Sequence, residues 1–148
     1  MRVCVQRAWV GAALGFAAGL AAPNAAIADC DRPAAVRFPA GAFAAEVTGG
    51  VPLGKRDCFT IDAGAGQTLS VTQRTALDDN IVFQLYPPGW KIRRGPEGTD
   101  ISGAALQGAG AGDDARTWSG TLPSKGDYLI VVGATRGGGE YRIRIEVR

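Results

Sequence analysis

The sequence predicts an all-β fold, an antiparallel β-sandwich of about seven to eight strands, and three observations support this. Beyond residue 28, apolar side chains recur at every second position, and no segment shows a helical period. Short apolar segments alternate with turns at regular spacing, as in two packed sheets. The 22 Gly and 8 Pro among 148 residues are many for a helical protein and ordinary for a fold with many turns.

Residues 1–28 are expected to be a cleaved signal peptide. Arg2 and Arg7 supply a positive start, residues 8–22 are apolar, and Ala26-Ile27-Ala28 forms a small-x-small cleavage motif. The apolar stretch is shorter than the roughly 20 residues that a membrane span needs. We therefore expect a single domain of residues 29–148 that is periplasmic or secreted and has no membrane span after cleavage.

Cleavage changes the charge of the chain. The full sequence has 16 Lys and Arg against 14 Asp and Glu, and cleavage removes two Arg and no acidic residue. The domain is then formally neutral, so no overall positive field attracts nucleic acid, and we expect no nucleic-acid partner. The sequence contains no His, which excludes nucleophile systems that depend on His and removes the commonest zinc ligand.

Two cysteines remain after cleavage, Cys30 and Cys58. In an exported chain, two cysteines most simply form a disulfide, which would tie the N-terminal end to a later strand. Closing this loop is worth roughly 3–4 kcal/mol in the chain-entropy model. A redox or metal-binding pair is the alternative, but the cysteines lack C-x-x-C spacing and a His partner.

The first strands are bounded by turn residues. Gln67–Arg74 alternates apolar and hydroxyl side chains, and Pro87-Pro88-Gly89 ends the apolar segment that precedes it. The expected strands up to this point are Ala35–Phe38, Phe43–Thr48, Asp57–Asp62, Gln67–Arg74 and Asn80–Tyr86.

The last two strands differ in pattern. Asp127–Val132 is almost continuously apolar, which predicts a central strand covered on both sides. Glu140–Val147 alternates apolar and charged residues, which predicts one buried and one solvated face. Gly137-Gly138-Gly139 between them predicts a hairpin turn. Residues 122–127 likewise predict a tight turn that sets the register of a hairpin.

Residues 87–115 depart from the regular spacing. This stretch is rich in Gly and Ala and longer than most connections without secondary structure. Within it, Ile101–Leu106 is expected to form a short edge strand or a turn. Trp and Arg are frequent interface anchors, and Arg pairs bidentately with carboxylates. The predicted partner-binding residues are therefore Trp90, Lys91, Arg93 and Arg94.

Alternatives to that site remain open at this stage. The four residues would also suit an acidic envelope glycan, with the indole of Trp90 stacked on a sugar, or would belong to a solvated, low-complexity insertion. If they bind a partner, Arg93→Glu with Arg94→Glu should abolish binding without lowering the melting temperature.

The acidic pairs of the sequence do not suggest catalysis. Asp78-Asp79 and Asp113-Asp114 are chain neighbours, and neighbours in a strand point to opposite faces, so neither is the facing pair of a glycosidase. Calcium at Asp29-x-Asp31 or Asp78-Asp79-Asn80 is an alternative, since oxygen-rich loops suit it. We expect no catalytic residue, no metal and no cofactor.

Three segments are familiar in their order and spacing. They read Ala-Gly-Ala-Gly-Gln-Thr-Leu-Ser-Val (63–71), Phe-Gln-Leu-Tyr-Pro-Pro-Gly (83–89) and Trp-Ser-Gly-Thr-Leu-Pro-Ser-Lys-Gly-Asp-Tyr (118–128). Together they resemble the bacterial pre-peptidase C-terminal (PPC-like) domain family, a family of small β-sandwiches. The start at residues 36–41 and the Leu-Pro-Ser-x-Gly-x-Tyr turn are similar to the periplasmic inhibitors of g-type lysozyme, a relative of that architecture.

The resemblance implies an exported, non-catalytic PPC-like binding domain. Its partner would be a protein or a cell-envelope glycan, and we expect it to act as a monomer. The alternative implied by the same resemblance is a periplasmic inhibitor of g-type lysozyme that blocks the muramidase cleft with its loops. Because a lysozyme cleft holds a catalytic carboxylate, an Arg-bearing loop would neutralise that charge while filling the groove.

Overall fold

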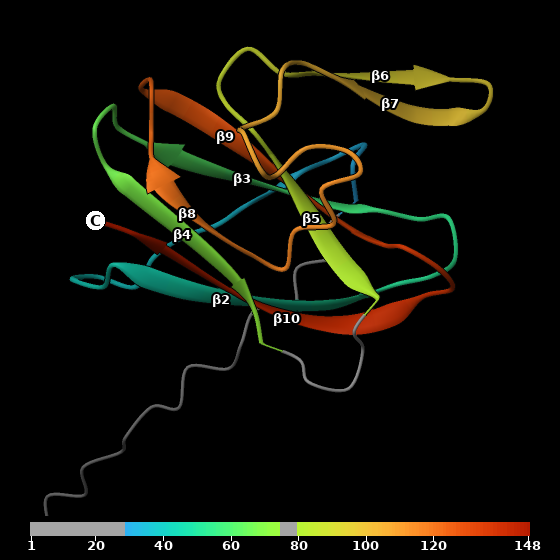
Figure 1. Cartoon of the computed structure of the whole chain (residues 1–148), viewed down its shortest axis with the longest axis horizontal. Coiled ribbons are helices and arrows are strands. Elements are labelled where there is room, and N and C mark those ends of the chain that lie inside the picture. Colours follow the sequence, from blue (N-terminus) through green and yellow to red (C-terminus); the bar gives the residue numbers. More distant parts are fainter. Residues whose placement is uncertain (1–28, 75–79) are drawn as a thin grey trace, which may run out of the picture.

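The computed structural model describes residues 29–74 and 80–148; the expected signal peptide, Asp78 and Asp79 lie outside them. The described strands form two four-stranded sheets, ordered β1-β3-β9-β5 and β2-β10-β4-β8, and a separate β6-β7 hairpin (Figure 1). The strands are β1 (Ala34–Ala35), β2 (Ala44–Val51), β3 (Asp57–Ala63), β4 (Thr68–Gln73), β5 (Ile81–Tyr86), β6 (Lys91–Gly95), β7 (Gly98–Ser102), β8 (Thr117–Thr121), β9 (Gly126–Ala134) and β10 (Gly139–Val147).

The β-sandwich predicted from the sequence is confirmed. Both sheets send apolar side chains inward, and the core between them includes Phe83 of the first sheet and Ile143 of the second, both almost fully buried. Within the described chain only β1 and β3 pair in parallel; the other strand pairs are antiparallel. The described residues contain no helix with the length and apolarity of a membrane span.

In two strands, the burial of the side chains can be compared with the pattern of apolar residues in the sequence. In β10 the apolar positions are buried, whereas Arg142 and Arg144 are exposed, as the alternation predicts. In β9 residues 128–132 are all buried. Ile130 faces the core between the sheets, and Leu129 and Val131 belong to a second apolar cluster. The prediction that this strand is covered on both sides is confirmed.

The two predicted hairpin turns are wrong. Strand β9 lies in the first sheet and β10 in the second, so Gly137-Gly138-Gly139 connects the two layers. Residues 122–125 do the same between β8 and β9. A Gly-rich turn allows either connection. The strand pairing shows the actual connection, because β9 pairs with β3 and β5 whereas β10 pairs with β2 and β4.

The connection from β8 to β9 is closed by a tyrosine. The Tyr128 hydroxyl donates to the Ser124 carbonyl at 2.6 Å and accepts from the Ser124 N–H at 3.2 Å, and Tyr128 is fully buried. Nearby, the indole of Trp118 lies across Gly120, where a Cβ would come within 2.7 Å of the ring. These aromatic residues therefore hold the corner between the sheets.

Part of the Gly/Ala-rich stretch covers the open edge of β5. The N–H of Phe83 donates to the Ala115 carbonyl and that of Leu85 to the Ala109 carbonyl, both at 2.9 Å. Leu106 N–H donates to the Leu85 carbonyl at 2.8 Å. The strand expected at Ile101–Leu106 is instead the second arm of a hairpin and ends at Ser102. Residues 103–116 form no strand of their own and instead run along the edge of β5, to which they form single backbone hydrogen bonds.

Candidate functional site

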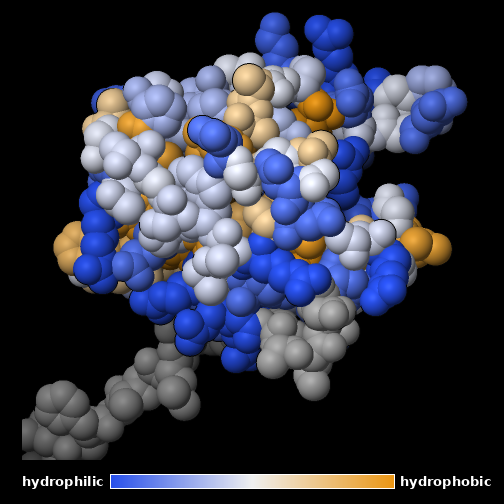
Figure 2. Space-filling view, in the orientation of Figure 1, coloured by the Kyte–Doolittle hydropathy of each residue, from blue (hydrophilic) through white to orange (hydrophobic). Residues whose placement is uncertain are grey.

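The β6–β7 hairpin stands out from one end of the sandwich (Figure 1). Gly95 and Gly98 are the last cross-strand pair, so Pro96 and Glu97 form the tip. Gly98 has φ 122°, a conformation that other residues rarely adopt, which permits so short a turn. Figure 2 shows strongly hydrophilic side chains along this projection. The hairpin carries three of the four residues predicted to bind a partner, and Trp90 directly precedes it.

The hairpin has an inner face that contacts the sandwich. Ile92 and its cross-strand partner Ile101 pack on the apolar cluster that contains Leu129. Trp90 packs there too, and its indole N–H donates to the Asp127 carbonyl at 2.8 Å. Trp90 is therefore half-buried and anchors the base of the hairpin.

Lys91 and Arg93 lie on the opposite, outer face, because neighbours in a strand alternate. Both are exposed, and in the described chain neither side chain has an ion pair or a hydrogen bond. The cross-strand neighbour of Arg93 is Asp100, and the two do not form an ion pair. Two cations are thus available to an incoming partner.

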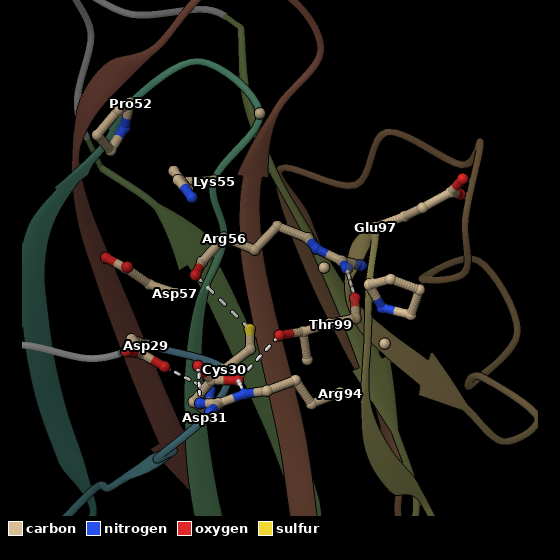
Figure 3. A pocket seen from close by; sticks show the side chains of 14 residues that line it. Asp29, Cys30, Asp31, Pro52, Lys55, Arg56, Asp57, Arg94, Glu97 and Thr99 are labelled. Carbon is tan, nitrogen blue, oxygen red and sulfur yellow. Dashed lines mark hydrogen bonds and ion pairs between the residues drawn. The ribbon is translucent and has the colours of Figure 1, made fainter.

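Arg94 is held by the body of the protein. Its guanidinium forms a bidentate ion pair with the Asp31 carboxylate, with Nε 3.3 Å from Oδ1 (Figure 3). The Thr99 hydroxyl donates to the same carboxylate at 3.0 Å. Hydrogen bonds from Arg94 and Thr99 lower the pKa of Asp31, and the same ion pair raises the pKa of Arg94. The predicted set of four therefore divides into an anchor, a tethered arginine and two free cations.

The predicted Cys30–Cys58 disulfide is confirmed. The two Cα atoms are 4.7 Å apart, and both cysteines are buried. The bridge fastens the segment that carries Asp31 to strand β3. Arg56, in the loop just before β3, donates to the Thr99 carbonyl, so this loop and the N-terminal segment both contact the hairpin (Figure 3).

A notch of about 620 Å³ lies between the hairpin tip and the loop from β2 to β3 (Figure 2). Its walls carry charges of both signs, and Asp31, Arg56 and Arg94 are already engaged with one another or with Thr99. The side chains of Lys55 and Glu97 have no partner within the described residues. Leu53, near the same loop tip, is 76% exposed. The charged lining makes the notch a polar surface feature at the foot of the hairpin.

One titratable pair lies partly inside the sandwich. The Tyr141 hydroxyl donates to the Asp57 carboxylate at 2.6 Å. Partial burial raises the pKa of Asp57, and the hydrogen bond from Tyr141 works against that rise. Burial also raises the pKa of Tyr141 far above its ordinary value of 10.0. The hydrogen bond gives each of these partly buried polar groups a partner, so the pair has a structural role.

Three of the acidic residues weighed for catalysis or calcium, Asp29, Asp31 and Asp113, have other partners in the structure. Asp113 accepts from the Gly110 N–H at 2.7 Å within its own loop, and Asp29 accepts from the N–H groups of Asp31 and Arg32. Asp31 is paired with Arg94, as above. Within residues 29–74 and 80–148, no three potential metal-ligating side chains come together.

Sequence reasoning missed the residues that hold the hairpin in place: Asp31, Arg56 and Thr99. From the sequence alone, Asp31 is a candidate only for calcium binding. Its position next to a predicted disulfide cysteine was the available signal, since a bridge fixes its neighbours. Thr99 had no comparable signal, because its position opposite Arg94 depends on the register of the hairpin.

Comparison with known proteins gives matches only among solved structures. No protein-family model matches, and no curated protein matches; the PPC-like resemblance thus stays a prediction. A PliG periplasmic inhibitor of g-type lysozyme from Aeromonas hydrophila matches 78% of this chain and 96% of its own, with 25% identity and a TM-score of 0.60. PliG of Salmonella Typhimurium matches 79% of this chain and 98% of its own, with 18% identity and a TM-score of 0.54.

A mutant of Escherichia coli PliG matches 78% of this chain and 97% of its own, with 18% identity and a TM-score of 0.55. At 18% identity, the Salmonella and Escherichia structures show the likeness of fold only. The chain is thus similar in fold, over nearly the whole length of each solved protein, to periplasmic inhibitors of g-type lysozyme.

Proposed function

We propose that this protein is a periplasmic inhibitor of g-type lysozyme. The observation that carries the proposal is the match to Aeromonas hydrophila PliG, which covers 96% of that inhibitor at 25% identity. A domain whose fold matches nearly the whole of an inhibitor is expected to act as a binding protein without catalysis. Of the two functions that the sequence suggests, we thus favour the lysozyme inhibitor over the general envelope-binding module.

We further propose that Lys91 and Arg93 on the outer face of the hairpin contact the enzyme. Lysozyme clefts contain catalytic carboxyl groups. A projecting cation complements the negative charge of an ionised carboxylate. Two adjacent cations on a narrow arm suit a groove better than a flat surface. The half-buried indole of Trp90, with its N–H already bonded to Asp127, offers less to a stacked sugar, which favours a protein partner over a glycan.

Export follows from the same proposal. Residues 1–28 act as the signal peptide and residues 29–148 as the mature inhibitor. The disulfide supports this, because such bonds persist in oxidising compartments such as the periplasm. Determination of the N-terminal residue of protein recovered from the periplasm tests it, and Asp29 is expected.

The test of inhibition is lysis of peptidoglycan by g-type lysozyme, followed by turbidity. The mature protein should stop lysis near a one-to-one ratio. Lys91→Glu with Arg93→Glu should weaken inhibition at least 100-fold, since two charge reversals at an interface exceed about 3 kcal/mol. The melting temperature should stay unchanged. No inhibition by the wild-type protein at large excess would reject the proposal.

The control variant is Arg37→Glu with Arg116→Glu. It changes the net charge equally, and both side chains are exposed without a side-chain partner in the described part of the chain. It should inhibit like the wild type. Arg94 is left intact in this design, because its reversal would break the pair with Asp31 as well as remove a cation. The Arg93→Glu, Arg94→Glu variant, which the sequence alone suggests as a test, would combine the loss of this ion pair with the loss of a binding cation.

A further inference from the structure

We infer that Asp31 is the positioning residue of the β6–β7 hairpin and that the Cys30–Cys58 disulfide fixes Asp31 where it can do this. The inference rests on the proposed function, because it concerns how the arm proposed to contact lysozyme is presented. In this arrangement, the binding arm is complete only when the disulfide is formed.

The hairpin needs such a contact because its outer half has no apolar support. Trp90, Ile92 and Ile101 pack on the sandwich near the base. Residues 95–98 at the tip are all exposed. Contacts from Asp31 and Arg56 therefore restrain the half of the hairpin that the apolar cluster does not reach.

Asp31 joins both strands of the hairpin at one level. Its carboxylate pairs with Arg94 on β6 and accepts from the Thr99 hydroxyl on β7. Arg94 and Thr99 are cross-strand partners, one pair away from the last pair before the tip. Figure 3 shows Asp31 beside both Arg94 and Thr99. One carboxylate thus sets where both strands lie relative to the sandwich.

The position of Asp31 depends in turn on the disulfide. Asp31 follows Cys30 directly, and Cys30 is bonded to Cys58 in β3. The turn around it is closed locally, since the Arg32 N–H donates to the Asp29 carbonyl at 3.1 Å. The first strand of the sandwich, β1, begins only at Ala34 and has two residues. Without the bridge, this N-terminal turn would lose its covalent attachment to β3.

Hydrogen exchange of the backbone amides tests the inference without lysozyme. Asp31→Asn removes the charge and keeps the size of the side chain. It should lower the protection of the β6–β7 amides about fivefold, in the range of a partly exposed charged contact, and leave β9 and β10 unchanged. Asp62→Asn, an exposed carboxylate on β3 with no partner in the described residues, is the matched control.

A reversed pair sharpens the test. Asp31→Arg with Arg94→Asp should restore protection relative to Asp31→Arg alone, whereas a general effect on folding would not be rescued. Removal of the bridge by Cys30→Ala with Cys58→Ala should lower hairpin protection at least as much as Asp31→Asn. Unchanged hairpin protection in Asp31→Asn overturns the inference.

Inhibition assays on the same variants separate the two proposals. If the wild type inhibits g-type lysozyme, Asp31→Asn should weaken inhibition about three- to tenfold with Lys91 and Arg93 intact. If the wild type does not inhibit, the proposed function fails, while the exchange result still decides whether Asp31 positions the hairpin.

Discussion

The sandwich and the β6–β7 hairpin are stabilised by different contacts. In the sandwich, alternate residues of the paired strands are buried between two sheets, so that Ile143 and Ile145 have no exposed surface. In β6 every residue except Ile92 is exposed, and polar contacts to Asp31 and from Arg56 hold the strand pair to the body. The body derives its stability from apolar burial, whereas apolar packing holds only the base of the hairpin and polar contacts hold its outer half.

Under the proposed function, this difference means that folding and partner binding depend on different residues. Substitutions on the outer face of the hairpin remove little buried surface and should hardly change the free energy of unfolding. Substitutions between the sheets should act on that free energy and leave the hairpin contacts in place. A scaffold of this kind lets the projecting residues vary without loss of the fold.

A matched pair of substitutions tests the comparison most strongly. Ile143→Ala, at a fully buried site, should lower the free energy of unfolding by about 4 kcal/mol. Ile92→Ala, at a half-buried site on the hairpin, should lower it by about 1 kcal/mol. Urea unfolding measures both. Equal losses would mean that the hairpin belongs to the cooperative core.

The disulfide joins the N-terminal turn that carries Asp31 to β3, so its removal should affect both the sandwich and the hairpin. Cys30→Ala with Cys58→Ala should lower the free energy of unfolding by about 3 kcal/mol, because the unfolded chain gains entropy. Denaturation of the oxidised and reduced wild type should show the same difference. As a control, a reductant should not affect the variant. A loss below about 1 kcal/mol would show that the bridge adds little beyond positioning.

The corner between β8 and β9 should give a smaller effect confined to the body. Tyr128→Phe removes the hydroxyl that bonds both backbone groups of Ser124. We expect a loss of about 1–2 kcal/mol in thermal unfolding, since a buried hydrogen bond is lost with little change in volume. Lysozyme inhibition should be unchanged below the melting temperature. Weakened inhibition in folded protein would connect this corner to the hairpin.

The smallest expected effect is a difference in pH dependence between two aspartates. The pKa of Asp57 is raised on folding, so its contribution to stability is full below its ordinary pKa of 3.8 and is lost as the pH rises through the raised value. The pKa of Asp31 is lowered, so its contribution is present above 3.8 and is lost as the pH falls through the lowered value.

Thermal unfolding between pH 3 and pH 7 measures both slopes. Asp57→Asn should gain stability relative to the wild type as the pH rises, and Asp31→Asn should lose stability relative to it. Asp62→Asn provides the reference for an exposed carboxylate. Slopes of the same sign for Asp57→Asn and Asp31→Asn would contradict the opposite environments described above.

Much of the sandwich can be predicted from the sequence because the burial of a strand determines the pattern of its apolar residues. The alternation in Glu140–Val147 and the apolar run in Asp127–Val132 each identify a strand and its environment. The connection between these strands could not be predicted, because Gly137-Gly138-Gly139 permits a hairpin and a crossing between layers equally.

The candidate site could be predicted only in part. Trp90, Arg93 and Arg94 stand out by residue type, but residue type does not tell a free cation from a tethered one. Arg94 is tethered because Asp31, far away in the sequence, is brought to it by the fold. Such a contact depends on tertiary structure, and local spacing does not encode it.

The Gly/Ala-rich residues beside β5 have a consequence for handling and expression of the protein. An uncovered edge strand offers a row of backbone donors and acceptors that other chains can join. Ala109 and Ala115, both buried, let the loop run close enough to occupy that row. Bulky substitutions there would lift the loop and invite strand-by-strand aggregation. We therefore expect the solubility of the protein to depend on the small side chains of Ala109 and Ala115.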